Sequence, residues 1–463
     1  MPAHETYDLV VIGSGEGGKF LAWHMAHAGR RVAVIERKLI GGSCPNTNCL
    51  PSKNEIWSAK VAHLARHGTQ FGVVADPIRL DMRKVVGRKR EMVRGLIDMH
   101  LDFYHANGAE LIMGTARFVA PRTIEVRLNE GGTRLMTAED VVINVGSRAS
   151  IPDIPGLADA APLTNVELLE LDRLPDHLIV LGGGYVGLEL AQAYRRFGSA
   201  VTLMDVNPQL LIREDPEVGA EILALMREEG MTVHLDATVL SVRGRSGDRV
   251  RVQARTPTGD LTIDGTDILV AVGRTPNTQG MSVGLAGVEL TQAGYVRVND
   301  RLQTTAPNTW AIGDCAGSPQ FTHASFDDFR IVRDNMSGGD RTTRDRLVPY
   351  CMFTDPALAR VGLNETEAKA RGIAVRVATL PNRFIMRAHT LSEMRGFMKV
   401  LVAADSDRIL GFAMVGAEAG EVVSTVQTAM LAGLPYTGLR DAILTHPTMT
   451  EGLIALMGKV PPG

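Results

Sequence analysis

The stretch "YDLVVIGSGEGGKFLAWHMAHAGRRVAVIE" (Tyr7–Glu36) decides the fold. It reads as an apolar strand, a glycine-rich turn, a helix and a second strand. The turn carries Gly13, Gly15 and Gly18, and an acid, Glu36, follows the first glycine by 23 residues. Glycines at this spacing let a backbone approach a pyrophosphate, the helix N-terminus meets its charge, and the acid accepts from a ribose hydroxyl. The stretch therefore predicts a dinucleotide-binding β-α-β unit.

A second copy of this design follows in "HLIVLGGGYVGLELAQAYRRFGSAVTLMD" (His177–Asp205). Its glycines are Gly182, Gly184 and Gly187, and Asp205 follows the first of them by the same 23 residues. One such motif is a weak signal, whereas two copies in the same strand and helix context are a strong one. The structural alternative is a pair of glycine-rich turns without a ligand. We expect an α/β protein with two Rossmann-like dinucleotide-binding domains.

Composition excludes several classes of function. The chain has 463 residues, enough for several domains, and a net charge of −3, which gives no electrostatic reason to bind nucleic acid or an anionic membrane. The beginning, "MPAHETYDLVVIGSG", lacks the basic and long apolar regions of a signal peptide. No window approaches the roughly 18 apolar residues of a membrane span. We expect a cytoplasmic protein with neither nucleic acid nor membrane as partner.

Two of the four cysteines, Cys44 and Cys49, lie in "GGSCPNTNCLPSK" (Gly41–Lys53). A structural disulfide here closes a short loop and contributes only about 2 kcal/mol. A zinc site needs a second pair of ligands, which Cys315 and Cys351 do not supply. Two buried reduced thiols or a redox pair remain. Because Cα atoms five positions apart in a helix are about 8.7 Å from each other, beyond disulfide reach, we expect Cys44 at or before a helix start.

Six motifs in one order resemble the pyridine-nucleotide-disulfide oxidoreductases: "GSGEGG", "GGSCPNTNCLPSK", "GGGYVGLE", "VGRTPN", "AIGDCAG" and "HPTMTE". These class I flavoprotein disulfide reductases include dihydrolipoamide dehydrogenase, glutathione reductase and mercuric reductase. The resemblance covers essentially the whole chain. It implies FAD at the first site, a nicotinamide cofactor at the second, and electron flow from NADH through the flavin to a cysteine pair and a disulfide substrate. Reduction of a mercuric or copper ion by the same thiols is the alternative.

The resemblance also implies residue roles. Cys49 is the thiol against the flavin and Cys44 is the thiol that attacks the substrate. Lys53 and Glu189 form an ion pair beside the flavin, and Tyr185 stands where glutathione reductases carry a mobile tyrosine over the nicotinamide pocket. Taken alone, Lys53 also fits a solvated surface lysine and Tyr185 a packing residue. Further residues are assigned to the cofactor sites on the same ground: Gly42, Ser43, Lys53, Ala116, Gly146, Glu189, Gly273, Arg274, Asp314 (on the ribityl chain of FAD) and Thr322.

The end of the second strand bears on the choice of cofactor. Sites for NADP usually place an arginine there to meet the 2′-phosphate. Here the strand ends in Asp205, which repels a phosphate and accepts from a free 2′-hydroxyl. Arg213 is near in sequence and leaves a route to NADPH open. We expect NADH to be favoured.

The domain pattern alternates along the chain. We expect residues 1–150 and 276–345 to form the FAD-binding domain, 151–275 the NAD-binding domain and 346–463 a dimerisation domain. In the last of these, "RGFMKVLVAADSDRILGFAMVG" predicts a hairpin, and "AEAGEVVSTVQTAMLAG" predicts an amphipathic helix ending at Gly433.

The chain closes with "THPTMTEGLIALM", which holds His446 and Glu451. Thr448 and Glu451 have the spacing of a helix capping box, so Glu451 has a purely structural alternative. The family resemblance instead makes Glu451 orient His446, a general acid–base that acts from the other subunit of a homodimer.

Several features separate the possible substrates. Mercuric reductases carry a vicinal cysteine pair near the C-terminus and lack this histidine, so its presence and the ending "MGKVPPG" favour a disulfide. "FTHASFDDFRIVRDN" (Phe321–Asn335) looks more like bacterial relatives tied to oxidant or copper stress, which favours a metal ion. Asn144 replaces the small residue usual in "INVGS".

Overall fold

The computed structural model describes residues 4–74 and 77–463, which form two compact units. Unit 1 combines residues 4–55, 83–150 and 273–346. Unit 2 combines the described residues of 56–82 with 151–272 and 347–463. Within the residues described in both units, no helix has the length and apolar character that crossing a membrane requires.

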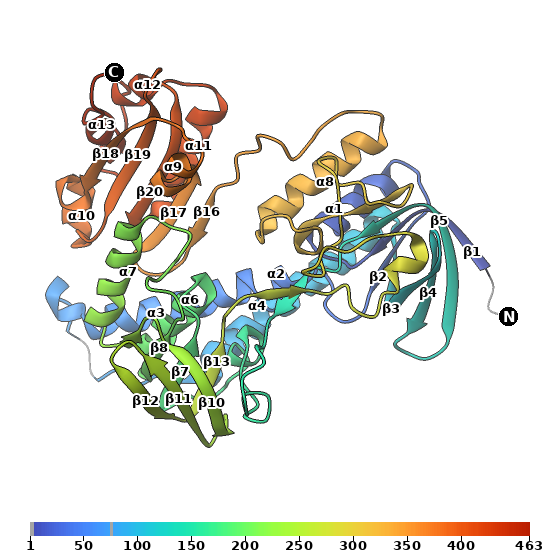
Figure 1. Ribbon diagram of the computed structural model, residues 1–463, viewed down its shortest axis with the longest axis horizontal. Helices are drawn as coiled ribbons and strands as arrows, with labels where there is room; N and C mark the ends of the chain where they lie inside the picture. Colours follow the sequence, from blue (N-terminus) through green and yellow to red (C-terminus); the bar gives the residue numbers. More distant parts are fainter. Residues whose placement is uncertain (1–3, 75–76) are drawn as a thin grey trace. The chain divides into compact units, whose positions relative to one another are not determined.

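A mixed sheet forms the centre of unit 1 (Figure 1). Its strands are β1 (His4–Ile12), β2 (Val32–Glu36), β3 (Glu110–Ala120), β4 (Thr123–Leu128), β5 (Thr133–Ile143) and β15 (Thr309–Ala311). Strand β1 pairs in parallel with β2 and β5, β2 with β3, and β5 with β15, so the parallel order is β3-β2-β1-β5-β15. Strand β4 joins β3 and β5 by antiparallel pairing. The parallel order is that of a dinucleotide-binding sheet.

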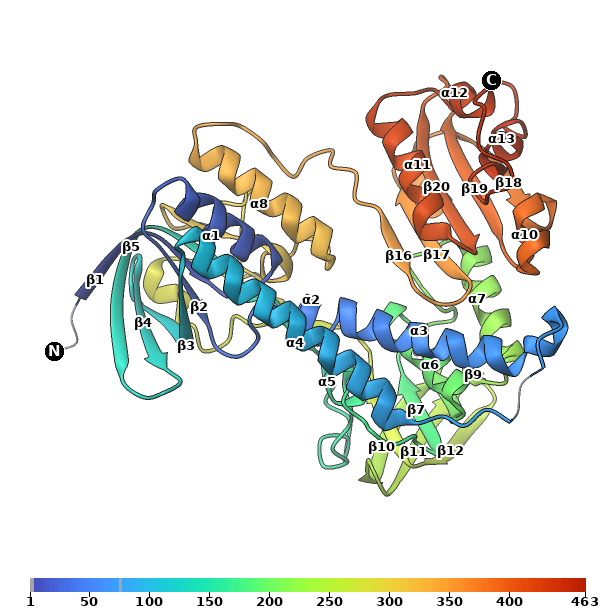
Figure 2. The same ribbon diagram turned by 180° about the vertical axis from the view of Figure 1, so that it is seen from behind.

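Strand β1 reads as an unbroken apolar run because both of its faces are buried. Leu9 and Val11 face the helices α1 (Glu16–His27) and α8 (Thr322–Met336), which lie side by side in Figures 1 and 2. Val10 and Ile12 pack instead with side chains of the antiparallel strands β3 to β5. The carboxyl end of β1 is therefore held from both sides, which fixes the glycine-rich turn that follows it.

Three further helices belong to the first part of the chain: α2 (Ser43–Asn46), α3 (Cys49–Arg66) and α4 (Met82–Asn107). A two-stranded ribbon of β6 (Ser147–Ala149) and β14 (Arg274–Pro276) lies where the chain leaves and re-enters unit 1. The remaining short helical turns are η1 (Gly68–Phe71), η2 (Val283–Ala286), η3 (Gly313–Ala316), α5 (Asn165–Leu168), α10 (Met386–Leu391) and η4 (Asn382–Phe384).

The second glycine-rich turn belongs to a parallel sheet of unit 2, in the order β13-β7-β8-β9. The elements of this part are β7 (His177–Leu181), α6 (Tyr185–Phe197), β8 (Ala200–Met204), α7 (Pro216–Glu228), β9 (Thr232–His234) and β13 (Asp267–Val270). An antiparallel sheet of β10 (Thr238–Arg245), β11 (Arg249–Thr256) and β12 (Gly259–Gly265) packs beside it. The parallel strands of these two sheets confirm the predicted α/β class with two Rossmann-like folds.

The C-terminal part of unit 2 is an antiparallel sheet in the order β16-β17-β20-β19-β18. Its strands are β16 (Tyr350–Met352), β17 (Ala357–Gly362), β18 (Val375–Pro381), β19 (Phe397–Ala403) and β20 (Ile409–Gly416). The helices α11 (Ala419–Leu431), α12 (Tyr436–Arg440) and α13 (Gly452–Met457) share one apolar core with it (Figure 2). The β19–β20 pairing confirms the predicted hairpin, and α11 ends two residues before Gly433, whose φ of +66° suits glycine.

Candidate active site

The first glycine-rich loop leaves no room for side chains. Gly13 has φ +101°, and a Cβ atom there would lie 2.4 Å from the carbonyl oxygen of Asn144 at the end of β5. The Ser14 N–H and Oγ–H both donate to Glu36 Oε2, over 3.0 and 2.8 Å. The loop is therefore packed closely on the residue that follows β5, and the acid at the end of β2 lies beside the loop, as a dinucleotide site requires.

The second site repeats this arrangement. Gly183 N–H donates to Asp205 Oδ2, and Asn207 N–H donates to the other oxygen over 2.8 Å. A Cβ atom on Gly184 would meet nothing within 4 Å, so this turn presents open backbone. Open glycine backbone, a helix that starts there and a ribose-binding acid fit a dinucleotide.

The cysteine pair belongs to two successive helices. Cys44 lies in the one-turn helix α2 and Cys49 is the first residue of α3, so Cys44 precedes the helix that carries Cys49, as predicted. Both thiols are reduced and half-buried. Gly42, at φ +82°, would bring a Cβ atom to 2.6 Å from the Gly15 Cα, which shows that the cysteine loop rests directly on the first glycine-rich loop.

The two thiols differ in their affinity for a proton. The Cys44 thiol donates to Cys49, the Thr322 hydroxyl lies 3.2 Å from the Cys49 sulfur, and the Lys53 ammonium adds positive charge nearby. These three groups outweigh burial and lower the pKa of Cys49 to about 6. The same hydrogen bond, with burial, raises the pKa of Cys44. At neutral pH the reduced pair is therefore a Cys49 thiolate beside a Cys44 thiol.

Helix α8 brings three polar side chains to this region. Thr322 contacts Cys49, Ser325 Oγ accepts the Gly17 N–H over 3.1 Å, and Asp328 Oδ2 accepts the Gly313 N–H over 2.7 Å. They are spaced three residues apart and so share one face of the helix. Sequence reasoning named Thr322 and missed Ser325 and Asp328, although their spacing in "FTHASFDDFR" was a usable signal.

The expected ribityl residue, Asp314, has two partners in unit 1. The Ser147 hydroxyl donates to Asp314, and Arg274 Nε lies 3.7 Å from the same carboxylate while it donates to Ser147 over 2.7 Å. Gly146 precedes Ser147 with φ +63°. The structure thus groups Gly146, Arg274 and Asp314, and it adds Ser147, which sequence reasoning missed.

Tyr185 is the first residue of α6, and hydrogen bonding fixes its hydroxyl. Its hydroxyl donates to Glu214 Oε1 over 2.9 Å, and the hydroxyl of Tyr350 donates to the same oxygen over 3.0 Å. Burial raises the pKa of Glu214, and Arg360 lies 3.4 Å from its other oxygen. Glu214 therefore fixes the position of the Tyr185 hydroxyl, although Tyr185 stands where glutathione reductases carry a mobile tyrosine. Sequence reasoning missed Glu214.

Other expected residues are placed within one unit or the other. Glu189 is buried in unit 2, where its carboxylate accepts the Phe353 N–H over 2.7 Å. Lys53 belongs to unit 1, so its pairing with Glu189 stays a prediction. Ala116 is buried in β3 of unit 1, and Gly273 has φ +142° with nothing within 4 Å of a Cβ atom placed there.

His446 and Glu451 are paired. His446 Nδ1 lies 2.8 Å from Glu451 Oε2, and the imidazole is 69% exposed. Only half of the capping box forms: Glu451 N–H donates to Thr448 Oγ1 over 3.2 Å, while the carboxylate turns to the histidine. A carboxylate on Nδ1 orients the ring and leaves Nε2 to exchange a proton with a substrate.

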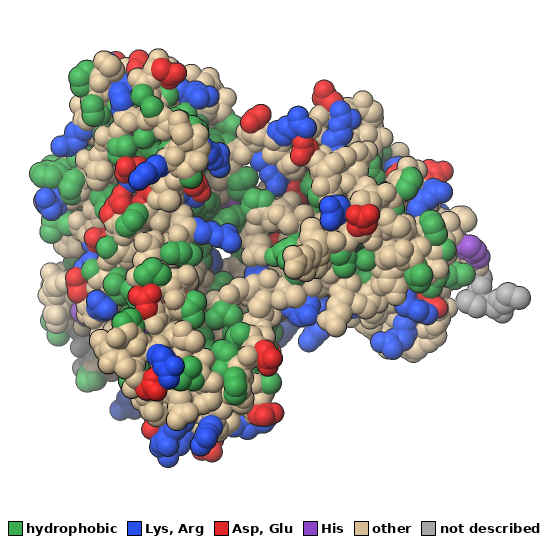
Figure 3. All heavy atoms as spheres, viewed as in Figure 1, with side chains coloured by type: hydrophobic (Ala, Val, Ile, Leu, Met, Phe, Trp, Pro, Cys, Tyr) green, Lys and Arg blue, Asp and Glu red, His purple; other side chains and the backbone are tan. Residues whose placement is uncertain are grey.

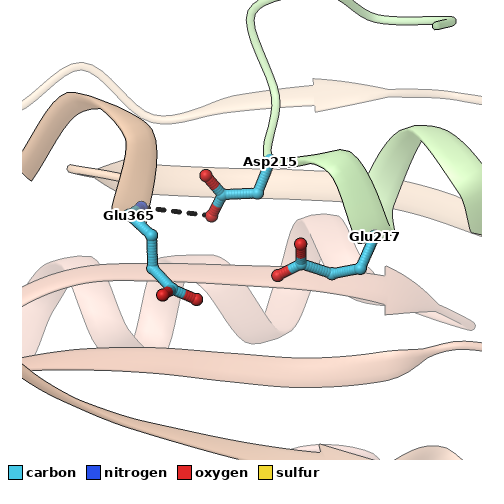
Figure 4. Close-up of side chains that lie close together, drawn as sticks. All are labelled: Asp215, Glu217 and Glu365. Atoms are coloured by element: carbon cyan, nitrogen blue, oxygen red, sulfur yellow. Dashed lines mark hydrogen bonds between the residues drawn. The ribbon is translucent and has the colours of Figure 1, made fainter. Parts of the chain in front are cut away.

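A group of three acids outside these sites resembles a metal site in its spacing. Figure 4 shows Asp215, Glu217 and Glu365 turned towards one another. The buried ammonium of Lys399 lies 2.8 Å from Asp215 and forms ion pairs with the other two. Burial alone raises the pKa of Asp215, but Lys399 and backbone N–H groups of α9 (Glu365–Ala370) lower it. Lys399 already supplies the cation of this cluster.

Charges of both signs are interspersed over the face shown in Figure 3. Lysine and arginine side chains alternate with aspartate and glutamate over each unit, in keeping with a net charge of −3.

Comparison with known proteins identifies the family. Residues 7–328 match the pyridine nucleotide-disulphide oxidoreductase family and residues 348–456 match its dimerisation domain. The chain therefore belongs to the pyridine nucleotide-disulphide oxidoreductases. It is an enzyme of the flavoprotein disulfide reductase class, a family that depends on FAD and a pyridine nucleotide, and its dimerisation domain supports a homodimer.

Particular relatives span nearly the whole chain. The probable pyridine nucleotide-disulfide oxidoreductase RclA of Escherichia coli is 36% identical, over 98% of this chain and 99% of its own. A mercuric reductase of Streptomyces lividans is 36% identical, over 98% and 96%. The solved Cu(II) complex of the HOCl-induced flavoprotein disulfide reductase RclA from Escherichia coli superposes with a TM-score of 0.88 at 35% identity, covering 98% of this chain and 99% of that one.

Proposed function

We propose that this enzyme passes two electrons from NADH through FAD to the Cys44–Cys49 pair and on to a disulfide substrate. The observation that carries the proposal is the asymmetry of the two thiols. Cys49 has a thiol donor, a hydroxyl and an ammonium around its sulfur, which lower its pKa to about 6, while Cys44 keeps its proton. A pair of inert buried thiols needs no such environment, whereas thiol–disulfide exchange needs one thiolate and one proton in transit.

The cofactor and domain assignments belong to this proposal. FAD is assigned to the first glycine-rich site, with residues 1–150 and 276–345 as its domain, and NAD to the second, within residues 151–275. When bound, the two cofactors supply the hydride and electron transfer. Asp205 supports NADH over NADPH, because its carboxylate accepts from a free 2′-hydroxyl and repels a 2′-phosphate.

The reaction on the substrate needs the cysteines and a base. Cys44 gives its proton to His446 of the partner subunit and attacks one substrate sulfur, so that a Cys44–substrate disulfide forms and the substrate S–S bond breaks. The leaving thiolate takes the proton from His446. Cys49 then attacks the Cys44 sulfur, which forms the Cys44–Cys49 disulfide and releases the second substrate sulfur as a thiolate that takes up one proton from solvent. NADH, one proton and the disulfide thus become NAD⁺ and two thiols.

The Glu451–His446 pair supports the disulfide reading because a leaving thiolate needs a proton. In the proposed homodimer, residues 346–463 form the interface domain and the histidine of one subunit serves the cysteines of the other. A reducing compartment such as the cytoplasm keeps the thiols ready between turnovers.

Reduction of a thiophilic metal ion is a second candidate. It is favoured by the mercuric reductases among the relatives and by the Cu(II) complex of RclA. In this reading Cys44 and Cys49 bind Hg(II) or Cu(II) as thiolates, and no proton has to reach a leaving group. His446 then has no chemical task.

The test is NADH oxidation by the purified enzyme with a panel of disulfides and with Cu(II) and Hg(II), repeated with His446→Ala. The disulfide proposal expects turnover of at least one disulfide and a loss of about 10²–10⁴-fold in the variant. If no disulfide is turned over and a metal ion is reduced equally well by both proteins, the metal-ion reading replaces it.

A further inference from the structure

Asn144 has a buried side-chain amide that lies against the glycines of the first glycine-rich loop. It follows β5 directly and is 6% exposed. Its backbone N–H donates to Ile12 O over 2.8 Å, and its side-chain Nδ2 donates to Gly13 O over 3.2 Å. The residue therefore holds the end of β1 and the first glycine of the loop at the same time.

The same amide fills the space that the other glycines leave. A Cβ atom on Gly15 would lie 2.9 Å from Asn144 Nδ2, and one on Gly18 would lie 2.4 Å from it. A Cβ atom on Gly313 would lie 3.5 Å from Asn144 Oδ1. Four glycines from two segments thus surround one side chain, and the shape of the loop depends on that side chain.

The second glycine-rich site provides an internal comparison. Ala271 follows β13 there, and a Cβ atom on Gly182 would lie 2.5 Å from Ala271 O, matching the 2.4 Å between Gly13 and Asn144 O. The second glycine of this turn has free space around it, since a Cβ atom on Gly184 would meet nothing within 4 Å, whereas one on Gly15 would meet Asn144. The two sites share one backbone plan and differ in having an amide or a methyl group at this place.

We propose that Asn144 is a positioning residue of the FAD site, which holds the first glycine-rich loop in the shape that receives the FAD pyrophosphate. The inference rests on the proposed assignment of that site to FAD. A loop held in its binding shape loses less freedom when the cofactor binds, so affinity rises without a new contact to the ligand. The amide needs the Gly13 carbonyl in return, because a buried donor without an acceptor is costly.

The experiment measures FAD release from purified holoenzyme by the fluorescence of free FAD on dilution. Asn144→Ala gives the first site the residue of the second, and we expect the dissociation constant of FAD to rise about tenfold, which corresponds to about 1.4 kcal/mol. Asn144→Asp keeps the shape, removes the donor and adds a negative charge near a pyrophosphate, so a larger rise is expected. Binding of NAD⁺ to the second site should be unchanged in both.

Asn382 is the matched control. It is fully buried in unit 2, and its amide donates to Arg395 O and Val415 O, so Asn382→Ala should lower thermal stability but not FAD affinity. Equal FAD affinity in wild type and Asn144→Ala, or an equal loss in Asn382→Ala, overturns the role of Asn144. A wild-type protein that holds no FAD would instead refute the proposed function itself.

Discussion

Replacement of Thr322 by valine tests how the Cys49 thiolate is stabilised. The Thr322 hydroxyl lies 3.2 Å from the Cys49 sulfur at the first turn of α8. A hydrogen bond to a charged group contributes about 1.5–3 kcal/mol, and one pKa unit corresponds to about 1.36 kcal/mol, so Thr322→Val should raise the pKa of Cys49 by about 1–2 units. The pKa of Cys49, which its neighbours lower, should therefore move back towards that of an ordinary thiol.

The assay uses a Cys44→Ser background, in which Cys49 is the one thiol of the pair and serine still offers a hydroxyl. The long-wavelength charge-transfer absorbance between the Cys49 thiolate and the flavin is recorded against pH. Because the thiolate is the deprotonated form, the band is lost as pH falls through the pKa, and Thr322→Val should shift that loss to higher pH. Thr322→Ser keeps the hydroxyl and should keep the midpoint. An unchanged midpoint in Thr322→Val would refute the hydroxyl as a donor to the thiolate.

Three further predictions follow from the other contacts. Mixing inactive Cys44→Ser and His446→Ala subunits should restore activity because a hybrid dimer has one intact composite site; proven subunit exchange without activity would rule out catalysis across the dimer. NADH should exceed NADPH by at least about tenfold in kcat/KM, about 1.4 kcal/mol, and equal values would contradict the role given to Asp205. Lys399→Met should cost about 3–5 kcal/mol in unfolding by denaturant at neutral pH because it leaves the buried Asp215 and its two neighbouring carboxylates without their cation. The exposed Lys459→Met is its control, and an equal effect of the two would show that the buried ion pairs do not matter.

The features that could be predicted from the sequence are local ones. Both glycine-rich turns and their acids lie within one β-α-β unit each, so spacing alone was enough to find them. The hairpin of β19 and β20 and the end of α11 were readable for the same reason. Helix geometry predicted that Cys44 lies before the helix that carries Cys49. It did not predict that Cys44 belongs to a separate one-turn helix, α2.

The features that could not be predicted depend on contacts between distant segments. Asn144 meets Gly13 and Gly313 only because β1, β5 and β15 are neighbours in one sheet, so that the residues that follow these strands lie close together. The hydroxyls of Tyr185 and Tyr350 donate to the same oxygen of Glu214, and no short sequence motif connects these three residues. The sequence around Glu451 fitted both a helix capping box and a carboxylate that orients His446. Its hydrogen bond to His446 was visible only in the structure.

The central claim is that Cys44 and Cys49 form one redox pair with distinct roles, coupled to the flavin. The most direct measurement is the absorbance spectrum of each single-cysteine variant as purified and after stepwise anaerobic addition of NADH. We predict that Cys44→Ser shows the long-wavelength charge-transfer band before any reduction, because Cys49 can then form no disulfide with its partner and stays a thiolate at pH values above its pKa, and that Cys49→Ser lacks the band throughout. A band in Cys49→Ser and none in Cys44→Ser would reverse the two roles. No band in either variant, nor in the wild type after two electrons, would contradict the claim that this pair exchanges electrons with the flavin.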